Sequence, residues 1–183
     1  MRASAPRLSI PAALLLAALT LSALGLPVLS GCSPAVRGSM ALSSGDYNLA
    51  LAHYQEALRQ DPGSVYLRLR IGLTYFTMGD YASAEATYQD ILARSPGQPD
   101  ALFYLGLSRI GKGERKTALE ELTRFNWSDK FYHQKFVREE AERLLRHPDM
   151  PAAETTRRLL DALEEGRKEQ LQLERDMFMG LDR

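Results

Sequence analysis

The stretch from Val65 to Gln98, VYLRLRIGLTYFTMGDYASAEATYQDILARSPGQ, carries the pattern that decides the fold. Its small residues and one bulky position recur about 34 residues earlier and about 34 residues later. The positions in register are Gly72, Gly79, Ala84 and Tyr88 in this stretch, Gly38, Gly45, Ala50 and Tyr54 before it, and Gly106, Gly113, Ala118 and Leu122 after it. A fixed period of this length predicts an array of helix-turn-helix repeats.

The spacing assigns a physical role to each kind of residue in the repeat. Gly72 and Ala84 are expected where the two antiparallel helices of one hairpin touch, because small side chains let the backbones approach. Gly79 and Asp80 are expected to make the turn inside the hairpin, and Pro96 to end its second helix.

The segment Gly72–Tyr88 has the pattern G-x-x-Y-x-x-x-G-D-Y-x-x-A-x-x-x-Y and resembles the tetratricopeptide repeat (TPR) family. The resemblance extends from about Pro34 to about Asp129. It implies an all-α fold in which the first helix of each repeat lines a concave groove. It also implies a protein that binds other proteins through that groove.

The repeat pattern predicts an array of about three repeats followed by further helices. The expected segments are an abbreviated repeat at 37–64, a repeat at 65–98, a third repeat at 99–130, a capping helix at 131–147 and a C-terminal helix at 151–179. The first repeat is abbreviated because Ala41 stands where the second has Tyr75. The stretch Glu164–Gln170 is almost entirely polar and contains Gly166, so the last segment is either one bent helix or two.

Aromatic residues gather around the start of the capping helix. They are Phe125, Trp127, Phe131, Tyr132 and Phe136. They form either the core between the last repeat and its cap or an exposed partner site, since aromatic residues concentrate in binding hot spots. Within the cap, Phe131 and Phe136 are expected to pack inward, and Glu139 and Glu140 to face solvent.

The N-terminus has the layout of a signal peptide, predicted at residues 1–31. Arg2 and Arg7 precede an apolar run, Ala12–Leu26, and the segment ends in Leu29-Ser30-Gly31-Cys32. This ending resembles the bacterial lipoprotein box, which implies that the Cys32 thiol takes a diacylglycerol and that its amine is acylated after cleavage, for example with palmitate. Residues 32–36 would then be the lipidated cysteine and a short tether. The alternative is an uncleaved anchor helix.

In the bacterial lipoprotein pattern, an Asp after the cysteine retains the protein in the inner membrane. Ser33 stands there instead, so we expect an outer-membrane lipoprotein of the cell envelope that faces the periplasm. The formal net charge of the chain is +0, which gives no electrostatic signal for nucleic-acid binding.

The residues needed for catalysis or metal binding do not occur in a recognisable arrangement. His53, His133 and His147 are widely spaced, and lipidation would consume the single cysteine of the chain. The sequence therefore predicts a protein that is not an enzyme, with no cofactor and no metal.

The predicted groove carries an apolar stripe on the first helices of the second and third repeats, with one basic residue beside it. These candidate partner-binding residues are Leu69, Arg70, Leu73, Phe76, Phe103, Leu107 and Ile110. Chaperone-binding TPR proteins have Lys and Asn on this face to hold a C-terminal carboxylate, so the leucines here argue against that activity. An apolar groove suits an amphipathic partner helix.

Two functional hypotheses follow. The first is a membrane-anchored adaptor or assembly scaffold that binds an envelope protein or peptide through the groove. The second is a structural, self-associating lipoprotein whose groove is filled by its own C-terminal helix, which includes the possibility of a homo-oligomer.

Overall fold

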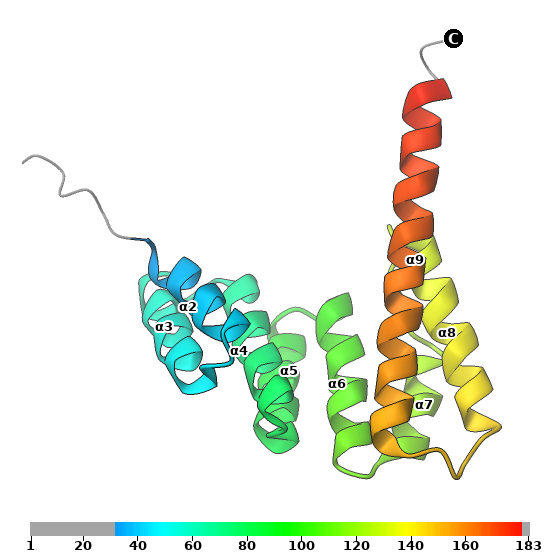
Figure 1. Ribbon diagram of the computed structural model, residues 1–183, viewed down its shortest axis with the longest axis horizontal. Coiled ribbons are helices and arrows are strands. Elements are labelled where there is room, and N and C mark those ends of the chain that lie inside the picture. Colours follow the sequence, from blue (N-terminus) through cyan, green and yellow to red (C-terminus); the bar gives the residue numbers. More distant parts are fainter. Residues whose placement is uncertain (1–31, 181–183) are drawn as a thin grey trace, which may run out of the picture. The chain divides into compact units, whose positions relative to one another are not determined.

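The computed structural model describes residues 32–180, and all its regular elements in this range are α-helices (Figure 1). These helices all belong to one compact unit, which begins at Ser33. The helices are α2 (Pro34–Ser43), α3 (Tyr47–Gln60), α4 (Val65–Met78), α5 (Tyr81–Arg94), α6 (Pro99–Gly111), α7 (Arg115–Leu122), α8 (Phe131–Leu145) and α9 (Ala152–Gly180). The prediction of an all-α array of helical hairpins is confirmed.

The two helices of each predicted hairpin come closest at the glycine that the repeat pattern marks. A Cβ atom added to Gly72 would lie 2.8 Å from the Tyr88 ring, and one added to Gly38 would lie 2.7 Å from the Tyr54 ring. Both tyrosines are fully buried. The small residue is therefore required, because α4 and α5, like α2 and α3, approach until an aromatic ring rests on the glycine backbone.

The turn inside the second hairpin also has its predicted chemistry. Gly79 has a φ of 82°, in the left-handed region that favours glycine, and it ends α4. The Asp80 carboxylate then accepts a hydrogen bond of 3.1 Å from the backbone N–H of Ser83, which caps the start of α5.

The C-terminal helix settles the question that the sequence left open, since α9 is one continuous helix. It packs against α8 and also against α6 (Figure 1). Arg115, at the start of α7, fixes the connection between α8 and α9. Its guanidinium donates to the carbonyls of Leu144 and His147, at 2.8 and 2.9 Å, and to the buried Thr155 hydroxyl at 3.0 Å.

Two expectations for the capping helix are wrong. Phe131 is 60% exposed, and Glu140 is buried, because the face of α8 that meets α7 and α9 differs from the predicted one. The buried residues of α8 are His133, Val137, Glu140, Ala141 and Leu144. Phe125 is buried in the core and Trp127 packs against it, so these two members of the aromatic cluster have the core role.

The predicted signal peptide, including Leu29, Ser30 and Gly31, lies outside the described residues. Cys32 is described and exposed. Within residues 32–180, none of the helices combines the length and the apolar character needed to cross a membrane.

Candidate partner-binding face

The part of the predicted groove that α6 would line is buried inside the protein. Phe103, Leu107 and Ile110 are fully buried, so the expectation that they line an open groove is wrong. They belong to one core cluster with residues of three later helices, including Leu119 of α7, Val137 of α8 and Leu159 of α9. The physical reason is the path of α9, which lies against α6 and removes this stripe from water.

The half of the predicted groove on α4 stays partly open. Leu69, Arg70, Leu73 and Phe76 are all intermediate in exposure. Leu69 and Phe76 also pack against the cluster that contains Tyr88. This half of the stripe can therefore still meet a partner, and the α6 half cannot.

A shallow groove of about 510 Å³ runs between α2 and α4. Its lining residues are Ala35, Val36, Ser39, Met40, Ser43 and Tyr66. Val36, Met40 and Tyr66 are 47%, 61% and 57% exposed, which is high for large apolar side chains. We name these six lining residues, together with Leu69 and Leu73, the α2–α4 face.

Val36, Met40 and Tyr66 were not predicted from the sequence as partner-binding residues. One signal was available for Tyr66, which precedes Leu69 by three residues and Leu73 by seven and so shares their side of the helix. No equivalent signal marked α2, because its repeat is abbreviated.

A hydrogen-bonded network joins the three helices next to this face. The Tyr54 hydroxyl lies 3.0 Å from the Ser39 hydroxyl and accepts a bond of 3.1 Å from Arg70 Nε. The Arg70 guanidinium carbon also lies 5.6 Å from the centre of the Tyr54 ring. Arg70 is therefore engaged inside the array, and its role is to hold α2, α3 and α4 together as a firm base for the face.

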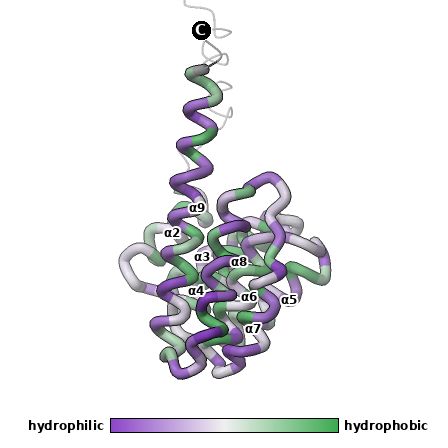
Figure 2. Tube along the Cα trace, turned by 90° about the vertical axis from the view of Figure 1, so that its right-hand side faces the viewer, coloured by the Kyte–Doolittle hydropathy of each residue, from purple (hydrophilic) through white to green (hydrophobic). Residues whose placement is uncertain are grey.

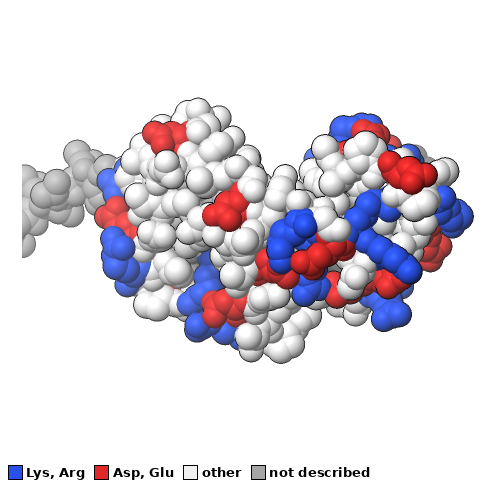
Figure 3. Space-filling view, turned by 90° about the horizontal axis from the view of Figure 1, so that it is seen from below, with Lys and Arg blue, Asp and Glu red and all other residues white. Residues whose placement is uncertain are grey.

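The surface seen from below is hollowed between its N-terminal and C-terminal halves, and side chains of both charge signs lie next to one another (Figure 3). One such group joins α5, α6 and α7. Glu85 lies 2.6 Å from Lys112 Nζ and 3.0 Å from Arg109 Nε, and Arg109 also pairs with Glu121. The hydrogen bond from Lys112 is the main cause that lowers the pKa of Glu85. These charges neutralise one another and connect helices.

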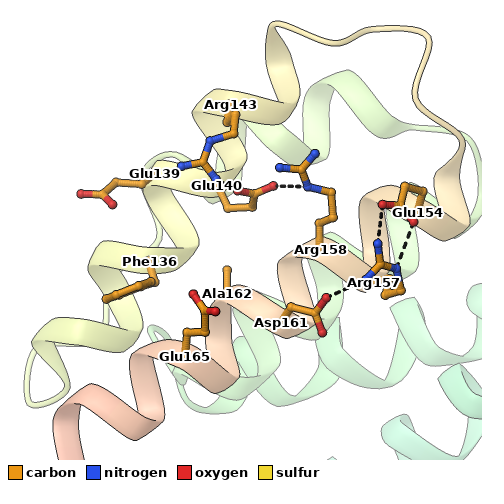
Figure 4. Close-up of a pocket in the computed structure, with 10 residues that line it drawn as sticks. All are labelled: Phe136, Glu139, Glu140, Arg143, Glu154, Arg157, Arg158, Asp161, Ala162 and Glu165. Atoms are coloured by element: carbon orange, nitrogen blue, oxygen red, sulfur yellow. Dashed lines mark hydrogen bonds and ion pairs between the residues drawn. The ribbon is translucent and has the colours of Figure 1, made fainter.

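A second charged group lines a polar cleft of about 400 Å³ between α8 and α9 (Figure 4). The buried carboxylate of Glu140 lies 2.7 Å from Arg158 Nε and also pairs with Arg143. Arg157 binds Glu154 and Asp161 at 2.6 and 3.0 Å. The cleft is thus a set of ion pairs, and the part of the chain that the structure describes contains no group of acidic, histidine or cysteine residues able to hold a metal ion.

Residues 41–110 match the family model described as the tetratricopeptide repeat. This segment of the chain is similar to TPR repeats, and its helical hairpins are consistent with that family. Comparison with curated protein sequences gives no significant match. The matched residues run from the last turn of α2 to the last turn of α6 and include Tyr66, Leu69 and Leu73, whereas Val36 and Met40 precede them. TPR segments are non-catalytic and generally bind protein partners, so the open face described above is the part of this chain that fits that role.

Proposed function

We propose that this protein is a lipid-anchored, non-enzymatic adaptor of the bacterial cell envelope that binds a protein or peptide partner through the α2–α4 face. One observation carries the proposal: large apolar side chains remain exposed on α4, within the residues that match the TPR model, and on α2 just before them, while the equivalent stripe on α6 is buried. Exposed apolar side chains that line one groove are typical of an interaction site.

The partner is an amphipathic segment, preferably a helix. The α2–α4 face presents apolar side chains with the hydroxyls of Ser39 and Ser43 and carries no charged residue. Its nearest basic group, Arg70, is already bonded to Tyr54. A charged carboxylate would thus find little compensation here, whereas an apolar helix face would bury its own side chains against Met40 and Tyr66.

The proposed lipid anchor places this face close to a membrane. If Cys32 carries the lipid, Val36 lies four residues further along the chain and so within about 14 Å of it. The partner would then be an envelope protein that meets the array at the membrane surface. Ser33 supports the outer membrane as the site of attachment, with the array in the periplasm.

A pair of matched substitutions tests the partner face. Leu73→Asp introduces a charge on the α2–α4 face, and Lys116→Asp introduces the same side chain on α7, where Lys116 is 85% exposed. We expect Leu73→Asp to abolish capture of partner protein from envelope membranes and Lys116→Asp to leave it unchanged. Equal capture by both variants would contradict the proposal.

The second hypothesis, a structural lipoprotein filled by its own C-terminal helix, has one observation in its favour. The chain's own α9 lies against α6, and Phe103, Leu107 and Ile110 are buried in the resulting core. If the protein has only this structural role, Leu73→Asp should capture the same proteins from envelope membranes as the wild-type chain.

A further inference from the structure

The last turns of α9 expose more large apolar side chains than any other helix of the described chain. Leu171, Leu173, Met177, Phe178 and Met179 are 42%, 39%, 56%, 73% and 61% exposed. The helix projects past the other helices, and hydrophobic positions recur along the projecting part (Figure 2).

Part of this surface continues the face with which α9 packs against α8. A Cβ atom on Gly166 would lie 2.6 Å from the Tyr132 carbonyl oxygen, so the two backbones touch there. One turn later, the buried Gln170 accepts a hydrogen bond from the Tyr132 backbone N–H at 3.5 Å. Leu173 and Met177 follow Gly166 and Gln170 by seven residues, about two helical turns, and therefore lie on the same side of α9.

The neighbour of this face ends before the face does. Helix α8 begins at Phe131, and Lys130, just before it, forms an ion pair of 3.2 Å with Glu174 of α9. Leu173 lies at the end of this contact, and Met177 lies almost one turn beyond it, past the first residue of α8; both side chains are exposed. Phe131, itself 60% exposed, extends the apolar surface at the junction.

We propose that the projecting end of α9 pairs with the same segment of a second copy of the chain. The second copy supplies the helix that is missing beyond Phe131, and it continues a helix–helix contact that already exists in each copy. The two helices run antiparallel. In a parallel pair the body of the second copy would lie beside the part of α9 that α8 already covers, up to Phe131, and there is no room for it.

The charges of the segment favour a second copy over a lipid surface. Residues 167–179 contain three basic and three acidic side chains, namely Arg167, Lys168, Arg175, Glu169, Glu174 and Asp176. Two such neutral segments do not repel each other, and an anionic membrane gains no attraction from them. The paired segment is about ten residues, or about 15 Å, long, so the contact is small and the association reversible.

Two methionines of similar exposure make a matched test. Met177 lies on the α8-facing side, whereas Met179 follows the exposed Gln172 by seven residues and lies on the other side. The full chain in detergent is examined by sedimentation equilibrium over a range of concentrations. We expect a monomer–dimer equilibrium, weakened about tenfold or more by Met177→Asp and unchanged by Met179→Asp.

Melting temperatures of both variants are measured in parallel, since both side chains are exposed and neither change should unfold the body. A wild-type chain that is monomeric at every concentration would overturn the proposal, and so would equal weakening by the two variants. A third result would also overturn the proposal. If the wild-type chain forms no dimer in detergent but binds lipid vesicles, and Met177→Asp loses this binding, the face belongs to a membrane contact. The pairing requires neither the lipid on Cys32 nor the α2–α4 face.

Discussion

Leu73 and Leu107 occupy equivalent positions of successive repeats, about 34 residues apart, but their surroundings differ. Leu107 is fully buried between α6 and the C-terminal helices, and Leu73 is partly exposed on the α2–α4 face. The same substitution, Leu→Ala, on the same kind of helix should therefore have unequal effects on the free energy of unfolding.

The magnitudes follow from burial. Removing a fully buried leucine side chain costs about 2–5 kcal/mol, because the lost apolar contacts leave a cavity that the core only partly fills. At a partly exposed site water enters the space, and the loss is about 1 kcal/mol or less. In a chain of this size each kcal/mol lowers the melting temperature by roughly 2–4 °C. Leu107→Ala should thus lower it by roughly 4–20 °C, and Leu73→Ala by roughly 4 °C or less.

Thermal unfolding followed by circular dichroism at 222 nm, supported by urea titration, measures both effects. The two variants have the same change in helix propensity, so the difference between them reports burial alone. Equal destabilisation of the two variants would refute the assignment of Leu107 to the core and of Leu73 to an open face.

Three further predictions concern the C-terminal helices and the anchor. Arg115→Ala removes three hydrogen bonds that fix the α8–α9 connection, and it should lower the free energy of unfolding in urea by about 1–3 kcal/mol. Arg115→Lys should not restore the loss, because a single ammonium group cannot reach all three acceptors. Burial of His133 lowers its pKa below the ordinary value of 6.5, so protonation favours the unfolded chain. The free energy of unfolding should therefore fall as the pH drops from 6.5 through the lowered pKa, and His133→Gln should reduce this dependence on pH. An unchanged pH dependence in the variant would exclude His133 as its cause. Mass spectrometry of the mature N-terminal peptide should find Cys32 as an acylated first residue, and an unmodified Cys32 or a retained Met1 would show that the anchor is wrong.

The repeat period was sufficient to predict the hairpins and their turns. Gly72 and Gly79 have local roles, a close contact with the partner helix and a left-handed turn, and both are visible in a single repeat. The groove was predicted only in part, because an apolar stripe on a helix does not reveal which later helix covers it. Leu107 and Leu73 look identical in sequence, and only the path of α9 separates them.

The capping helix shows the same difficulty. The sequence predicted an inward face with Phe131 and Phe136, whereas the close approach of α9 at Gly166 goes with a face that buries His133 and Glu140 and exposes Phe131. The burial of Glu140 could not be predicted from the sequence, because it depends on an ion pair with Arg158 from another helix. Ion pairs between distant segments are a property of the assembled fold.

The proposal that a partner binds the α2–α4 face is tested most directly by site-specific photocrosslinking in intact cells. A photoreactive phenylalanine analogue replaces Met40, Tyr66 or, as the control on α7, Lys116, all of which are exposed. We expect one crosslinked product of the same mass from positions 40 and 66 and none from position 116. The same product from all three positions, or a product from position 116 alone, would contradict it.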